Sequence, residues 1–175
     1  MTARKSLVLL LLALVAGALL LTGRQTVADN RIGVRIGPLG RVTAARAGER
    51  LLVLPGIQKL IELPADPVQF VMAGQGAIPV ETNGQPGSIG CQVRYQIVDG
   101  ARLLGRHGAD APLAGLERTI REQVQRLLAE ALARDPASLD EVGRRIVLVA
   151  ATHHELATGL ADAGVSVQSF ELLSW

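Results

Sequence analysis

The chain has 175 residues, a net charge of +2 and only 2% aromatic residues. Its length suits one domain plus an appendage, and its weak charge and few rings exclude the usual basic or base-stacking surface for nucleic acid. The single cysteine, Cys91, excludes an internal disulfide and a cysteine-based zinc site.

The first predicted element is a membrane anchor over residues 1–23. Arg4 and Lys5 precede an uninterrupted apolar run of fifteen residues, 7–21, which is near the short end of the roughly 17 to 25 residues that span a bilayer. The alternative is a secretory signal peptide, cleaved at a small-x-small site at 16–18 or 26–28. The leading basic residues favour a cytoplasmic N-terminus, so we expect a single-pass protein whose domain lies on the periplasmic or extracytoplasmic side.

A strand-rich region follows the anchor. Residues 24–30 are polar and read as a linker. Apolar and polar side chains then alternate over 31–36 and again over 68–72, which predicts two half-buried strands. The Gly-Pro turn at 37–40 ends the first of them. Residues 57–63 fit a strand or a short helix, and the prolines that follow favour a strand.

The clearest strand is predicted over residues 88–98. Its apolar face carries five consecutive alternating residues, Ile89, Cys91, Val93, Tyr95 and Ile97. The other face is polar, as in an antiparallel strand with one side in water. Because Cys91 falls on the apolar face, we expect a core thiol rather than a reactive one.

Helical periodicity replaces the alternation after Asp99. Residues 101–107 predict one or two helical turns, and a longer amphipathic helix follows, ended by Asp135-Pro136. Its apolar face comprises Leu113, Leu116, Ile120, Val124, Leu127, Leu128 and Ala131. The opposite side over 117–134 is charged and reads as a solvated surface, with a subunit contact as the alternative.

A second amphipathic helix is predicted to begin at a capping box, with Ser138 as N-cap and Glu141 reaching back to it. Its expected core-facing residues are Leu139, Val142, Ile146, Val149, His153, Leu156 and Leu160. Gly164 stands where a left-handed C-terminal cap belongs. A last strand starts at Val165, and the shift in phase at Phe170 predicts a bulge.

These elements predict an α+β fold. A mostly antiparallel sheet comes first, followed by two amphipathic helices and a closing strand, in one domain over residues 31–175. We expect an N-terminal transmembrane helix to precede this domain.

No constellation of residues in the sequence indicates catalysis. The segment from His154 to Thr158 imitates the zinc-protease helix, but Thr158 replaces the second histidine. His153 reads as a core or interface histidine, and the carboxylates are scattered among arginines on helix surfaces. We therefore expect a protein that is not an enzyme, with no catalytic, cofactor-binding or metal-ligating residues.

Several segments in this order resemble the band 7 (SPFH) domains of stomatin, prohibitin and HflC-like proteins. Residues 33–42 (GVRIGPLGRV) resemble the opening strand-turn-strand of those domains, and 50–64 (RLLVLPGIQKLIELP) resemble the stretch that follows. Residues 93–99 (VRYQIVD), 119–124 (TIREQV) and 163–167 (AGVSV) are similar to the family's later strand, helix and last-strand entry. The match runs over residues 30–173.

The resemblance implies a membrane-anchored scaffold without cofactors, which oligomerises and organises or regulates other membrane proteins. Its implied partners are the lipid bilayer, further copies of itself or a related SPFH subunit, and a membrane protease or channel. Family members usually continue into a long assembly helix, whereas this sequence ends at Trp175, so we expect a short or truncated member. The alternative function is a secreted or periplasmic binding domain released from a cleaved signal peptide.

Overall fold

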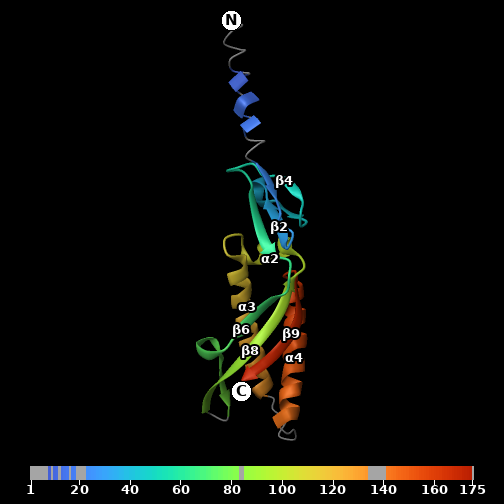
Figure 1. Ribbon diagram of the computed structural model, residues 1–175. Coiled ribbons are helices and arrows are strands. Elements are labelled where there is room, and N and C mark those ends of the chain that lie inside the picture. Colours follow the sequence, from blue (N-terminus) through green and yellow to red (C-terminus); the bar gives the residue numbers. More distant parts are fainter. Residues whose placement is uncertain are drawn as a thin grey trace. The chain divides into compact units, whose positions relative to one another are not determined.

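The computed structural model describes residues 23–82, 85–133 and 141–174, together with residues 8, 10, 11, 13–15, 17 and 18. It confirms an α+β fold with antiparallel strand pairs, amphipathic helices and a C-terminal strand (Figure 1). The elements are β1 (Arg24–Thr26), β2 (Arg31–Ile36), β3 (Val42–Ala45), β4 (Arg50–Leu52), β5 (Lys59–Pro64), β6 (Val68–Met72), β7 (Ile78–Thr82), β8 (Gln85–Ile97), α2 (Gly100–His107), α3 (Pro112–Ala133), α4 (Glu141–Ala161) and β9 (Val165–Ser174).

The chain forms two compact units, Met1–Leu63 and Pro64–Trp175. The single domain expected over residues 31–175 stays a prediction, and the boundary between the two units falls inside that range. Alternation and helical periodicity show which residues of one strand or helix share a face. They do not show which elements pack together, so they cannot predict the division into two units.

Most of the predicted anchor, residues 1–23, lies outside the described residues. Of the residues that are described, none belongs to a helix with both the length and the hydrophobicity needed to cross a bilayer.

The first unit is built from short strands. β1 pairs antiparallel with β4, and a second sheet has the order β3-β2-β5. The expected linker over residues 24–30 is therefore partly wrong, because Arg24–Thr26 is strand β1. All three β1 residues are exposed, so their pairing with β4, more than twenty residues away, produces no alternating pattern. The core of this unit comprises Val27, Val34, Ala45, Val53 and Leu63.

The second unit is organised around β8. β6 pairs with residues 91–95 of β8 and β9 with residues 90–97, both antiparallel, so these two strands lie on opposite edges of β8. β7 pairs with the beginning of β8. The five residues predicted to face the core, Ile89, Cys91, Val93, Tyr95 and Ile97, are all buried. The strands predicted at 31–36, 57–63 and 68–72 are also present.

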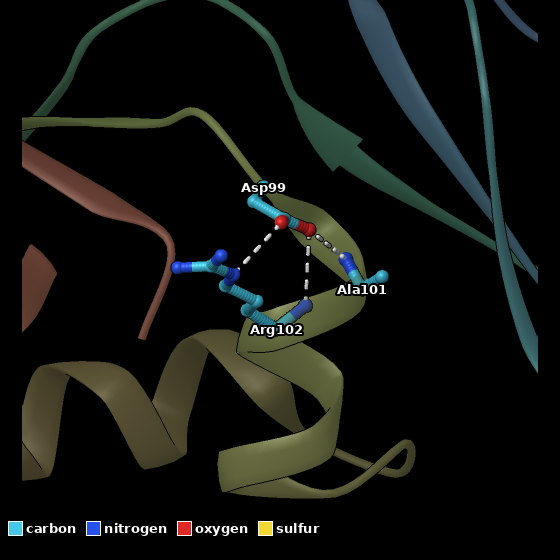
Figure 2. A network of polar contacts seen from close by, with 3 residues as sticks. All are labelled: Asp99, Ala101 and Arg102. Atoms are coloured by element: carbon cyan, nitrogen blue, oxygen red, sulfur yellow. Dashed lines mark hydrogen bonds and ion pairs between the residues drawn. The ribbon is translucent and has the colours of Figure 1, made fainter. Parts of the chain in front are cut away.

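Helix α2 begins at an N-cap that the sequence analysis did not identify. The Asp99 carboxylate accepts hydrogen bonds from the backbone N–H groups of Ala101 (3.0 Å) and Arg102 (3.1 Å), and it also pairs with the Arg102 side chain at 3.2 Å (Figure 2). Such a cap satisfies two of the N–H groups that a helix start leaves without partners. The cap could have been predicted from the Asp99-Gly100 dipeptide, which lies directly before the helical pattern.

Helix α3 buries the predicted apolar stripe. Its buried residues are Pro112, Leu116, Ile120, Val124, Leu127 and Leu128, whereas Leu113 and Ala131 are only half-buried. The predicted stop at Asp135-Pro136 and the N-cap Ser138 lie outside the described residues, and so does the side chain of Glu141.

Gly164 closes the turn that follows α4, three residues after Ala161, with the left-handed backbone that was predicted for it. Its φ of +74° is the left-handed conformation that glycine adopts without strain. Its carbonyl oxygen accepts hydrogen bonds from the N–H groups of Val98 (2.9 Å) and Asp99 (3.0 Å). This single residue therefore joins the end of α4 to the junction between β8 and α2.

Candidate interaction surface

Helix α4 presents apolar side chains to water. Val142 is 65% exposed and Ile146 is 64% exposed, and Val149 and His153 are half-exposed. These four residues lie within about 40° of one direction around the helix, because each residue advances about 100°. We call them the α4 face.

The prediction of which side of α4 is covered was wrong. The sequence pattern placed the α4 face in the core with Leu156 and Leu160, but the buried residues are Leu148, Thr152, Leu156 and Leu160. These follow steps of four residues, and each such step turns about 40° beyond a full circle. A neighbour that crosses a helix at an angle covers such an inclined row rather than a stripe parallel to the axis.

A groove separates α4 from β9, which run beside each other in Figure 1. Its volume is about 530 Å³, and its lining residues are Arg145, Ile146, Val149, Ala150, His153, Gln168, Ser169 and Phe170. Three members of the α4 face therefore form one wall, and the middle of β9 forms the other. Among the described residues that line the groove, none is acidic.

Arg145 connects the two walls near one end of β9. Its Nη2 donates a hydrogen bond to the carbonyl oxygen of Leu172 at 2.6 Å. This short, charge-assisted contact satisfies a backbone carbonyl of β9. It also holds a cationic group at the groove.

β9 has an edge that carries no strand. It pairs with β8 on one side, and within the described part of the chain no strand pairs with its other side. The register leaves Gln168 without an opposite residue, because Ser169 faces Arg94 and Val167 faces Tyr95. This is the bulge predicted from the shift in phase before Phe170.

Two histidines of α4, His153 and His154, have different surroundings. His153 lines the groove, and its Nε2 is buried without a hydrogen-bond partner among the described residues. His154 is exposed, and its carbonyl oxygen accepts a hydrogen bond from the Thr158 hydroxyl at 3.0 Å. In the described ranges no three His, Cys, Asp or Glu side chains come together as metal ligands would.

A second depression, of about 400 Å³, lies between α3 and α4. Its polar lining residues are Arg126, Glu130, Thr152, His154 and Glu155. Arg126 and Glu130 pair with each other at 3.1 Å, so the charges there largely compensate one another. The buried Thr152 hydroxyl has no hydrogen-bond partner among the described groups. This arrangement favours neither an anion nor a cation.

Cys91 and Tyr95 belong to the core rather than to a reactive site. Burial raises the pKa of Cys91 to about 11, and the nearby Arg121 opposes that rise in part. Burial also raises the pKa of Tyr95 to about 12, with a further contribution from Glu117. Both groups are therefore protonated at neutral pH, and a protonated thiol is a poor nucleophile and metal ligand. The expectation of a core thiol is confirmed.

Arg121 has a structural role on α3. Its Nη1 donates to the carbonyl oxygen of Gly76 at 2.7 Å, and its guanidinium lies 5.9 Å from the centre of the Phe70 ring. These contacts hold the Gly74–Gly76 turn, between β6 and β7, against the helix.

Comparison with known proteins adds no relative: no family model matches the chain, and no curated protein matches it. The resemblance to band 7 domains therefore stays a prediction. The sequence pattern predicted all four residues of the α4 face, including His153, to lie in the core. Arg145 and the open edge of β9 were not predicted, because neither has a local sequence signal.

Proposed function

We propose that this chain is a membrane-anchored scaffold of the band 7 (SPFH) type, which oligomerises and organises or regulates other membrane proteins such as a membrane protease. The observation that carries the proposal is the α4 face. Large apolar side chains exposed together on one side of a helix indicate a contact with another macromolecule. Val142 and Ile146 are both more than 60% exposed on that face.

Two further observations support a role in binding. The titratable groups in the core, Cys91 and Tyr95, have pKa values shifted away from reactivity at neutral pH. The groove beside the α4 face combines an apolar wall with the backbone of an edge strand, and such surfaces recognise protein segments. The band 7 family is proposed because of the collinear resemblance over residues 30–173.

The test is the mass of the detergent-solubilised full-length protein, measured by light scattering coupled to size exclusion. We expect a species of many subunits. The variant Val142→Asp places a charge at the end of the α4 face that lies outside the groove. It should lower the mass at equal protein concentration, because burying an unpaired charge in an interface is costly.

Val98→Asp is the matched control, since Val98 is 62% exposed and is hydrogen-bonded to Gly164, just beyond the opposite end of α4 from Val142. It should leave the mass unchanged. A monomeric wild-type protein would contradict the oligomeric scaffold, and an equal loss of mass in both variants would contradict the assignment of the contact to α4.

A further inference from the structure

The open edge of β9 determines what kind of ligand the groove can hold. Gln168, Ser169 and Phe170 line the groove, and they belong to a strand with no strand partner on its outer side among the described residues. The main-chain N–H and C=O groups at such an edge pair readily with another extended chain. A polypeptide in extended conformation can therefore add to β9 as a further strand.

The opposite wall suits alternate side chains of such a strand. Successive side chains of a strand point to opposite faces, so every second one would meet Ile146, Val149 and Ala150 of α4. Ile146 is 64% exposed without a partner, and covering it would remove apolar surface from water. The wall therefore favours apolar residues at alternate positions of the ligand.

Charge favours an acidic group on the same ligand. Arg145 uses one of its N–H groups for the carbonyl oxygen of Leu172, and a guanidinium has five such donors. Among the described lining residues there is no carboxylate to compensate it. Glu171 lies next in sequence to the lining, and its carboxylate accepts a hydrogen bond from Ser169 at 3.4 Å.

The shape of β9 argues against a second copy of the same strand as the ligand. Gln168 is bulged, and the register shift between Gly90 and Cys91 places a second irregularity at Leu173. Bulges twist an edge away from long, regular pairing. β9 keeps a regular register with β8 in two short stretches, 165–167 and 169–172, and the groove borders the second of them, which suits a short strand from another protein.

We infer that the groove between α4 and β9 is a docking site for a short extended segment of a different protein, with apolar residues at alternate positions and an acidic residue that meets Arg145. This inference rests on the proposed function, since it names the chemistry of the protein that the scaffold binds. The segment adds to the edge of β9, and its apolar side chains cover Ile146 and Val149.

Binding of a designed probe to the full-length protein in detergent tests this inference. The probe is a fluorescein-labelled hexapeptide of alternating valine and threonine that ends in glutamate, followed by fluorescence anisotropy. A matched peptide carries proline in place of each threonine and cannot pair as a strand. We expect saturable binding of the first peptide only, with slower hydrogen exchange of the backbone amides in residues 168–172.

Substitutions then locate the site. Ile146→Asp should weaken binding about tenfold or more, because it places a charge against the apolar side of the peptide. Arg145→Gln should weaken it about fivefold by removing the partner of the glutamate. Val147→Asp is the matched control on the same helix, since Val147 is 52% exposed but does not line the groove, and it should bind as the wild type does.

The inference would be overturned by equal binding of the proline peptide, by equal weakening in Val147→Asp, or by the absence of saturable binding. Self-association that persists in Val142→Asp, is lost in Ile146→Asp and competes with the peptide would also overturn it, in favour of a second copy as the ligand, because Ile146 lines the groove and Val142 does not. The mass measurement and the peptide measurement are separate readouts. An oligomer that does not bind the peptide therefore contradicts only this inference.

Discussion

At the scale of single residues, Gly164 joins three elements and tolerates no side chain. Its φ is +74°, and a Cβ built on it would collide with the carbonyl oxygen of Asp99. Gly164→Ala should therefore lower the free energy of unfolding by about 2 kcal/mol or more, because it combines left-handed strain with a clash against backbone. Urea denaturation of the detergent-solubilised protein, followed by circular dichroism, measures the change.

Gly105→Ala is the matched control for that substitution. Gly105 is exposed within α2, and a Cβ there would meet no atom within 4 Å. Alanine should stabilise the helix by up to about 1 kcal/mol, since glycine is the poorer helix former. Equal and small effects of the two substitutions would show that the position of Gly164 is not constrained as described.

His107 makes stability depend on pH. Desolvation, with a smaller contribution from Arg106, lowers the pKa of His107 below its ordinary value of 6.5. The unfolded chain then binds a proton at His107 more readily than the folded chain does. The contribution of neutral His107 to the free energy of unfolding is therefore complete above about pH 6.5 and is lost as the pH falls below it. Unfolding measured between pH 7.5 and 5, in steps of roughly half a unit, should show this decline.

The variant His107→Gln should remove that part of the pH dependence, because glutamine does not titrate. His154→Gln is the control, since His154 is exposed on α4. If the decline below pH 6.5 is the same in wild type and His107→Gln, another group causes it.

At the scale of elements, α4 shows why an apolar pattern does not identify a core face. Val142, Ile146, Leu156 and Leu160 fit one helical stripe, yet only the last two are buried. The covered row of the helix is inclined to its axis, and the row is chosen by the neighbours that cross it. α3 and β9 are those neighbours.

Stability measurements distinguish the two sides of α4. Leu156 is fully buried, and Leu156→Ala should lower the free energy of unfolding by about 2 to 5 kcal/mol through lost burial and the cavity left behind. Ile146→Ala removes an exposed side chain and should change it by about 0.5 kcal/mol or less. A large loss for Ile146→Ala, measured on the monomeric form, would mean that the α4 face is covered within the chain.

At the scale of the whole molecule, the proposal depends on the retention of residues 1–23. We expect the full-length protein to stay with the membrane after high-salt and carbonate washing, because an apolar run of this length is released only when it fails to insert. A variant lacking residues 2–23 is the control and should be extracted. A wild-type protein that is washed off and begins between Gly17 and Asp29 would instead support a cleaved signal peptide.

The sequence by itself determined the features that repeat locally. The alternation in β8 predicted five core residues, the stripe of α3 predicted Leu116, Ile120 and Val124, and Gly164 predicted the end of α4. Each of these depends on the side-chain period of one element or on one residue's backbone freedom. A few consecutive residues are enough to predict features of this kind.

Only the tertiary structure decided what lies against what. It paired the exposed β1 with β4, divided the chain at Leu63, covered one row of α4 and left the edge of β9 open beside Arg145. These features depend on segments far apart in sequence, and periodicity within a segment does not encode its neighbour. The α4 face and the groove are therefore properties of the folded chain.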